Sequence, residues 1–394
     1  MKFNKVVYVR YLPLTSTIYK DFYFEELLQN KIKVEYLDVT ELFYPERVTT
    51  VTLDFEGVIK VKSYKQLELY LKQQLNDEVL YISLMTFESR VFKLHRLFTK
   101  FNLNLGVFGR GDFPSDISDV KSKLVRILKI ISFSRILLFC ANRSTILLKK
   151  WSYLKPYDYI FKAGEFGHWR LGMGSEIDFA KAKIVELNTA DYDEFLLHRE
   201  FHLENKNNYI VFLDQYLPYH PDARFLKIKT VEPEKYFKEI NSFFDKLEEK
   251  TGQKVIIAAH PKADLYKEIN PYNNRTIFFN KSNDLVKQAS LVLTHASTAV
   301  CFPICYEKRL ILLVSDYLDI VLPHFILIAK AIANACDATI IAMDKEIETQ
   351  IPEKINSEKY SDFKYKYLTS VQSENKFSKD IFINFLKSED KFPK

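Results

Sequence analysis

The sequence predicts two α/β domains, each built around a doubly wound parallel sheet. The chain has 394 residues, which is long for one domain and natural for two. Short apolar runs alternate with segments of helical periodicity, the pattern of a parallel sheet covered on both faces. Hydrophobic residues at 47% and charged residues at 27% indicate a globular chain with a large core. We expect one domain over 1–203, a second over 204–370, and a terminal helix and tail over 371–394.

In the first half, buried apolar runs predict strands, and periodic segments between them predict helices. The expected strands are 5–10, 33–37, 80–85, 104–108, 159–161 and 182–187. The expected helices are 15–30, 90–101, 122–133 and 135–148. Four of the nine glycines fall between Gly164 and Gly174, which predicts a flexible loop there. Polar residues over 204–208 predict the linker between the domains.

The second half repeats this alternation. The expected strands are 209–213, 254–258, 276–279, 291–293, 310–314 and 338–342. The expected helices are 194–202, 233–250, 282–288 and 375–386. Gly252 follows the long amphipathic helix over 233–250 and is expected to be its C-terminal cap.

Composition excludes several classes of protein. Neither G-x-G-x-x-G nor G-x-x-x-x-G-K-[ST] occurs, which argues against a Rossmann dehydrogenase and a P-loop enzyme. The net charge of +6 suits an anionic ligand, but no Lys/Arg block is dense enough for nucleic acid. The four cysteines lack paired metal spacing and indicate a reducing compartment. Without a leader or an apolar run of about eighteen residues, we expect a cytoplasmic protein, with any contact to the inner membrane peripheral and at its cytoplasmic face.

The segment 294–299 (THASTA) follows an apolar strand and is rich in hydroxyl groups. In an open α/β sheet, ligands bind at the carboxyl ends of the strands. Ser297, Thr298 and the nearby His295 therefore supply groups for binding a phosphate. The alternative is that Ser297 and Thr298 only cap a core helix, which explains the hydroxyl groups equally well.

A second strand ends in His260-Pro261-Lys262. His260 and Lys262 can both donate to a phosphate oxygen, and Pro261 ends the strand. Taken alone, a His-Pro pair is more often an ordinary turn. Together, the two strand ends predict one pocket for the phosphate of a nucleotide-sugar.

Two carboxylates are candidates for the chemistry. Asp214 directly follows the strand over 209–213, so it is expected at the same edge of the sheet and could be a nucleophile or a base. Asp222 closes the loop after that strand and is equally well explained as a turn residue. Glu165, in the glycine-containing loop of the first half, is the best acid/base candidate there, although a surface loop glutamate is the commoner explanation.

Charged residues elsewhere are weaker candidates. Asp191 and Asp193 have the Asp-x-Asp spacing of metal-dependent glycosyltransferases, but they precede an expected helix, so capping explains them better and no metal is predicted. Arg110, next to Gly109 and Gly111, could bind a carboxylate bidentately, or be a solvated turn residue. Lys308 is a further candidate cation for a donor carboxylate.

Three segments together resemble bacterial surface-carbohydrate biosynthesis proteins. The pattern resembles GT-B-fold transferases that use CMP-activated acidic sugars, in particular the retaining β-Kdo transferases of the WbbB type. It covers mainly 186–316, and Gln215 stands where an acidic residue is common in this family. The segments are 212–222 (FLDQYLPYHPD), 258–262 (AAHPK) and 295–299 (HASTA), with 191–193 (DYD) before them.

The resemblance implies two Rossmann-like domains facing a central cleft, and roles for the candidate residues. The CMP-binding role falls to His260, Pro261, Lys262, Ser297 and Thr298, with His295 nearby. Asp214 would be the nucleophile of a double displacement that retains configuration, and Glu165 the acid/base. No cofactor is implied beyond the CMP-activated sugar, and the acceptor would be an oligosaccharide or lipid-linked glycan.

Three other hypotheses for the function remain open. The first is an inverting sialyltransferase or other CMP-nonulosonate transferase, in which the carboxylate is a base. The second is a CDP-glycerol glycerophosphotransferase-like enzyme, and the third a sugar- or nucleotide-binding module without activity. The sequence does not determine the acceptor or the linkage.

Overall fold

The structure is a computed structural model that describes residues 2–46, 53–74, 78–110, 114, 133–166, 175–200, 208–220, 223, 229–347 and 351–388. The expected helix over 122–133 and the expected linker over 204–208 lie almost entirely outside these residues. The chain forms two compact units. One contains the described residues up to Ala190 and again from Thr369, and the other spans Asp191–Leu368.

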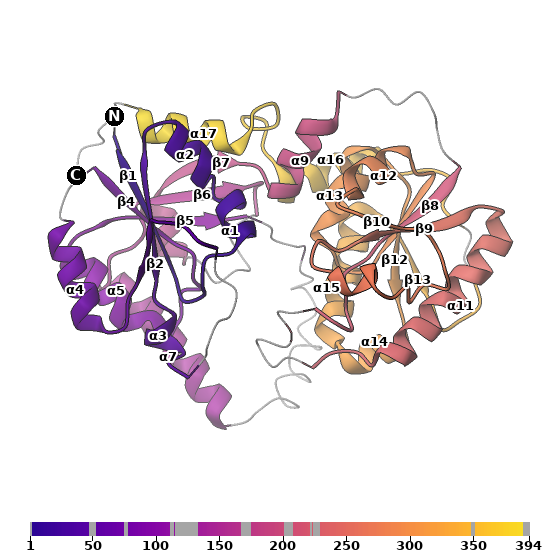
Figure 1. Ribbon diagram of the computed structural model, residues 1–394, viewed down its shortest axis with the longest axis horizontal. Helices are drawn as coiled ribbons and strands as arrows, with labels where there is room; N and C mark the ends of the chain where they lie inside the picture. Colours follow the sequence, from indigo (N-terminus) through magenta and orange to yellow (C-terminus); the bar gives the residue numbers. More distant parts are fainter. Residues whose placement is uncertain are drawn as a thin grey trace. The chain divides into compact units, whose positions relative to one another are not determined.

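The first unit contains a seven-stranded parallel sheet in the order β3-β2-β1-β4-β5-β6-β7 (Figure 1). Its strands are β1 (Lys5–Arg10), β2 (Lys33–Asp38), β3 (Val58–Lys60), β4 (Val79–Ser83), β5 (Asn104–Gly109), β6 (Tyr159–Ala163) and β7 (Lys183–Leu187). Its helices are α1 (Ser16–Asp21), α2 (Phe24–Gln29), α3 (Thr40–Phe43), α4 (Tyr64–Gln73), η1 (Ser89–Val91), α5 (Phe92–Lys100), α7 (Phe133–Lys150), α8 (Glu176–Lys181) and α17 (Ser378–Lys387).

The second unit contains a six-stranded parallel sheet in the order β10-β9-β8-β11-β12-β13. Its strands are β8 (Tyr209–Leu213), β9 (Lys254–Ala259), β10 (Ile277–Phe279), β11 (Leu291–Thr294), β12 (Leu310–Val314) and β13 (Thr339–Ala342). Its helical segments are α9 (Ala190–His198), α11 (Pro233–Thr251), η2 (Asp264–Lys267), α12 (Ser282–Gln288), η3 (Thr298–Val300), α13 (Cys301–Cys305), α14 (Asp316–Val321), α15 (Pro323–Cys336), α16 (Ser357–Phe363) and η4 (Lys364–Leu368).

Both sheets are doubly wound, so each buries apolar residues on both faces. Along β1, Val6 and Tyr8 belong to one core cluster, whereas Val7 and Val9 belong to the other. This alternation explains why the strands appear as continuous apolar runs in the sequence. In the second unit, α11 covers one face, and α12 and α13 cover the other (Figure 1). The predicted fold class, two Rossmann-like domains each built on a doubly wound parallel sheet, is confirmed.

The expected single helix over 15–30 is wrong, because the chain forms two helices with a break between them. Tyr23 has a φ of 64° at the N-terminus of α2, a left-handed conformation that a continuous helix excludes. The hydroxyl group of Tyr8 donates to the carbonyl of Phe22 at 2.6 Å, and its ring stacks on Phe24. Tertiary contacts on both sides of Tyr23 therefore stabilise the break.

The C-terminal helix α17 belongs to the first unit. The backbone N–H groups of Lys2 and Phe3 both donate to the carbonyl of Leu386, each at 3.0 Å. Phe382 and Phe385 pack in the same core cluster as the strands of the first sheet. Among the described residues, no helix is long and apolar enough to cross a membrane.

Candidate active site

The order of strands in the second unit defines a switch point between β8 and β11. The chain adds β9 and β10 on one side of β8 and then crosses to add β11, β12 and β13 on the other. Ligands of open α/β sheets bind in the crevice outside the carboxyl ends of the strands at such a point. Asp214 directly follows β8, His260 follows β9, and His295 follows β11. The predicted segments thus lie at the ends of three adjacent strands.

Asp214 is the buried carboxylate of this edge, with only 5% of its surface exposed. Its Oδ1 accepts from the Tyr272 hydroxyl at 2.8 Å, whereas Oδ2 has no hydrogen-bond partner among the described residues. Burial raises the pKa of Asp214 to about 6, against the lowering effect of Tyr272. Amide N–H groups of the surrounding loops lower this pKa too, although none reaches Oδ2 with hydrogen-bond geometry. The carboxylate therefore ionises around pH 6, and its Oδ2 is a buried polar atom without a hydrogen-bond partner in the described structure.

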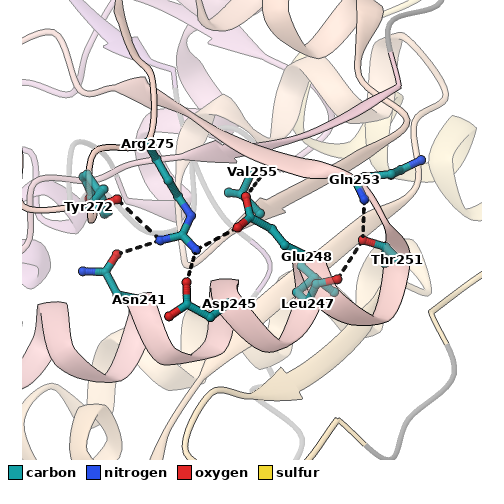
Figure 2. Close-up of polar contacts among 9 residues, drawn as sticks. All are labelled: Asn241, Asp245, Leu247, Glu248, Thr251, Gln253, Val255, Tyr272 and Arg275. Atoms are coloured by element: carbon teal, nitrogen blue, oxygen red, sulfur yellow. Dashed lines mark hydrogen bonds and ion pairs between the residues drawn. The ribbon is translucent and has the colours of Figure 1, made fainter.

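The Arg275 side chain fixes the loop that carries Tyr272 (Figure 2). One terminal nitrogen of Arg275 donates to Asp245 at 2.5 Å and to Glu248 at 3.0 Å, both on α11. The other donates to the Asn241 side chain at 3.3 Å and to the Tyr272 carbonyl at 3.4 Å. Because three residues of one helix bind this guanidinium group, the helix determines where the Tyr272 hydroxyl lies.

Replacing Tyr272 with phenylalanine is expected to raise the pKa of Asp214 above about 6. The variant removes the hydroxyl that donates to the ionised carboxylate, so the neutral form gains relative to the charged form. Carboxyl ¹³C NMR titration of the free protein, assigned with Asp214→Asn, measures this directly. Tyr266→Phe is the matched control, because the Tyr266 hydroxyl contacts Tyr272 at 3.5 Å and makes no hydrogen bond to Asp214. An Asp214 pKa that is the same in Tyr272→Phe as in the wild type would contradict this role.

His295 lies in the core, with no exposed surface. Its Nδ1 is 2.8 Å from the carbonyl of Leu313 and therefore carries the proton, while Nε2 accepts from the Tyr236 hydroxyl at 3.1 Å. Burial lowers the pKa of His295 to about 4, so the ring is neutral at physiological pH. Both nitrogens are used inside the protein. The structure thus places His295 in the core of the second unit, where it connects β11, β12 and α11.

Ser297 acts as a cap in this structure. Its hydroxyl accepts from the N–H of Ala299 at 3.2 Å at the start of η3, as the capping alternative predicts. Ser297 is half-buried and Thr298 is exposed, so both remain within reach of a ligand. Gln215 connects the segment after β8 to the segment after β11, because its side-chain amide donates to the carbonyl of Ala296 at 2.6 Å. The amide oxygen of Gln215 is buried and has no hydrogen-bond partner in the described structure.

The segment after β9 places its polar groups at the surface. Nδ1 of His260 accepts from the backbone N–H of Lys262 at 3.1 Å, which leaves the proton of the neutral ring on Nε2. His260 and Lys262 are half-buried, and Pro261 is exposed. The His220 ring, from the loop after β8, lies 5.0 Å from the His260 ring. Two imidazole rings therefore lie close together in the loops after β8 and β9, and the backbone of Lys262 contacts one of them. Asp222, in that same loop, lies outside the described residues.

The candidates of the first half, Glu165 and Arg110, follow adjacent strands of the other sheet, β6 and β5. Glu165 is exposed, after a turn in which Gly164 has a φ of 66°. Arg110 donates to the Tyr23 hydroxyl and, at 3.3 Å, to the carbonyl of Asp21. The Arg110 guanidinium thus contributes to the packing of α1 and α2.

The structure also places the remaining charged candidates of the sequence analysis. Lys308 directly precedes β12 and lies at the amino edge of the sheet, opposite Asp214, so it does not join this site. It lines an open cavity of about 750 Å³ with Ser290, Arg309 and Lys354. Asp191 and Asp193 lie in the first turn of α9, where carboxylates stabilise the helix N-terminus.

No family model and no curated protein matches the chain. Among solved structures, the chain is similar to the calicheamicin glycosyltransferase CalG4, with 11% identity, 98% of each chain covered and a TM-score of 0.49. It is similar to the wall teichoic acid polymerase TagF, H444N variant, with 10% identity, 98% and 88% of the two chains covered and a TM-score of 0.47. It is also similar to the UDP-GlcNAc 2-epimerase of Methanocaldococcus jannaschii, with 13% identity, 90% and 96% covered and a TM-score of 0.40. Similarity at this level assigns neither substrate nor reaction.

Proposed function

We propose that this chain is a metal-independent glycosyltransferase that transfers Kdo from CMP-β-Kdo to a saccharide acceptor in lipopolysaccharide O-antigen or capsule synthesis. The observation that carries the proposal is the buried carboxylate of Asp214, which has one unpartnered oxygen and lies between two strand ends whose side chains could donate to a phosphate. Glycosyl transfer from a nucleotide-sugar requires these two elements: cations or donors for the leaving phosphate and a carboxylate at the reacting carbon.

The leaving-group side of the site consists of the segments after β9 and β11. Negative charge grows on the CMP phosphate as the glycosidic bond breaks, so donors aimed at that phosphate stabilise the transition state. His260 presents an Nε2–H group, Lys262 supplies a positive charge, and Ser297 and Thr298 supply hydroxyl groups. Pro261 shapes this segment. We assign His295 a supporting role, since both of its nitrogens are bonded within the core.

In the proposed reaction, Asp214 is the nucleophile. Its carboxylate oxygen bonds to the anomeric carbon of the sugar, and the bond to CMP breaks with the electron pair leaving on the phosphate. The acceptor hydroxyl then attacks the same carbon, the Asp214 oxygen leaves, and the hydroxyl proton passes to a base. We assign that base to Glu165. Two inversions give net retention. Arg110 is the candidate partner for a sugar carboxylate.

The pKa of Asp214 supports a second candidate, an inverting sialyltransferase or other CMP-nonulosonate transferase. A carboxyl group with a pKa of about 6 is well matched to proton abstraction near neutral pH. In that reaction, Asp214 takes the proton of the acceptor hydroxyl while the hydroxyl oxygen attacks the anomeric carbon, and the bond to CMP breaks with its electron pair leaving on the phosphate. No covalent intermediate forms, so the search for a sugar adduct on Asp214 separates the two mechanisms.

A thermal-shift panel of CMP, CDP, UDP and GDP is expected to show the largest stabilisation with CMP. A ligand at a hundredfold excess over its Kd stabilises the protein that binds it by about 2.7 kcal/mol. Lys262→Ala should reduce the CMP-dependent shift in Tm, because the variant removes the positive charge of the segment after β9. Lys354→Ala is the matched control, since Lys354 lines the cavity at the amino edge of the sheet.

The same panel tests the alternatives. A preference for CDP would favour the hypothesis of a glycerophosphotransferase-like enzyme that uses CDP-glycerol. A preference for UDP or GDP would overturn the assignment of CMP as the donor nucleotide. If CMP binds but no transfer occurs with any acidic sugar, the chain is a nucleotide-binding module. We propose a cytoplasmic reaction with an oligosaccharide acceptor, or a reaction at the cytoplasmic face of the inner membrane with a lipid-linked glycan acceptor.

A further inference from the structure

Helix α7 exposes one face, which is both apolar and basic. From Cys140 on, its exposed residues recur at intervals of three and four, the spacing of a single helical face. Leu147 is 45% exposed, and Trp151, directly after the helix, is 70% exposed. Large apolar side chains with this exposure are candidates for an interaction surface. The α7 face consists of Cys140, Arg143, Ser144, Leu147, Lys150 and Trp151.

The orientation of this face is fixed from inside the protein. Lys149 and Asp178 form an ion pair in which neither side chain has any exposed surface, with N–O distances of 2.8 and 2.9 Å. The Lys149 ammonium also lies 3.5 Å from the centroid of the Phe87 ring. Because Lys149 is held in the core, the helix has no freedom to rotate, and its neighbours Leu147 and Lys150 point outward.

Aromatic and basic residues extend the α7 face towards α5. Tyr153 is 46% exposed, and the Arg96 guanidinium lies 4.0 Å from its ring centroid and donates to its carbonyl at 2.9 Å. Lys93 lies on the same helix as Arg96 and is exposed. Neither α5 nor the stretch from Cys140 to Lys155 contains an aspartate or a glutamate. The surface therefore combines exposed tryptophan, tyrosine and leucine side chains with positively charged side chains, and these two segments contribute no negative charge to it.

We propose that the α7 face, with Tyr153, docks on anionic membranes. Tryptophan and tyrosine are favoured at the boundary between lipid headgroups and acyl chains, where their rings are partly buried and their polar groups stay hydrated. Leu147 adds apolar area at the same level, and Arg143 and Lys150 face the anionic headgroups. The combination of charge and aromatic residues selects a lipid surface over a neutral protein partner. This inference does not depend on the proposed function.

The fluorescence of Trp151 provides the direct test. The chain has two tryptophans, so full-length Trp169→Phe protein, shown by circular dichroism to be folded, reports on Trp151 alone. Vesicles that contain phosphatidylglycerol should shift its emission to shorter wavelength, and lipids brominated on their acyl chains should quench it. Vesicles of phosphatidylcholine alone should have a much weaker effect. Equal effects of both vesicle types, or none with either, would overturn the proposal.

Vesicle flotation of full-length variants tests the residues. Arg143→Glu and Lys150→Glu should each lower the partition coefficient at least about fivefold, since each removes one cation from the lipid surface. Leu147→Ser with Trp151→Ser should abolish flotation. Ile320→Ser is the matched control, because Ile320 is 76% exposed on α14 of the other unit. Unchanged flotation of the α7 variants, or a dimer in solution that these substitutions dissociate, would contradict membrane docking.

Discussion

Replacing Asp214 with asparagine is expected to abolish sugar transfer and, at the same time, to stabilise the protein. The activity should fall at least about a thousandfold, because an amide is neither a nucleophile nor a base. Burial raises the pKa of this carboxyl group from 3.8 to about 6, so keeping it ionised at pH 8 costs up to about 3 kcal/mol of folding free energy. Asparagine has the same shape, still accepts from Tyr272 and carries no charge.

The stability that Asp214→Asn gains over the wild type should be larger at high pH than at low pH. The folded protein binds a proton at Asp214 more tightly than the unfolded chain does, so the cost of the carboxylate is fully present above pH 6 and disappears below pH 4. Urea unfolding of the wild type and of Asp214→Asn should therefore differ at pH 8 and converge at pH 4. Asp264→Asn is the control, since Asp264 is exposed and pairs only with Lys267 among the contacts that the structure describes. Transfer activity close to the wild type in Asp214→Asn would eliminate this residue from the chemistry.

Mass analysis of the intact protein with CMP-sugar donor separates the two mechanisms for Asp214. A donor-derived adduct that forms on the wild type and is absent from Asp214→Asn supports the nucleophile. Activity without an adduct, with an acid limb of the pH–rate profile near pH 6, supports the general base.

Replacing Asp178 with alanine is expected to destabilise the first unit by about 3–5 kcal/mol. The substitution leaves the Lys149 ammonium buried without its counter-ion, and burial already lowers the pKa of this group. It also removes the acceptor of the backbone N–H groups of Tyr157 and Ser175, at 2.9 and 2.7 Å. Urea unfolding monitored by circular dichroism measures the loss.

Two further variants test the cause of that loss. Lys149→Met combined with Asp178→Asn removes both charges and keeps an acceptor oxygen, so it should regain much of the stability. Glu346→Ala breaks the exposed ion pair with Lys246 and should have no measurable effect. If the double variant is no more stable than Asp178→Ala, the loss comes from packing and not from the unpaired charge.

Most strands could be predicted from the sequence, because they are short apolar runs buried on both faces. The edge strand β3 was not predicted, since its three residues are half-buried or exposed. The expected runs 5–10, 209–213 and 310–314 coincide with β1, β8 and β12. Helix boundaries were harder to predict, since the break at Tyr23 depends on the aromatic contacts of Tyr8, which is distant in sequence.

The site could be predicted where it consists of residues that directly follow strands. Asp214, His260 and Ser297 were identified in this way. Tyr272 and Arg275 were missed, because they lie in a loop without regular spacing, and their roles depend on residues about 30 and 60 positions away. The sequence also did not show whether His295 binds a ligand or lies in the core. That difference depends on Tyr236 and the Leu313 carbonyl.

The return of the chain to the first unit has a consequence for folding during synthesis. A ribosome releases Asp191–Leu368 before it releases α17, which supplies Phe382, Phe385 and Leu386 to the core of the first unit. The second unit, which contains Asp214, can therefore fold while the first still lacks part of its core. The first unit starts earlier and finishes later, and until α17 docks it exposes the apolar edge that this helix covers, where chaperones would bind.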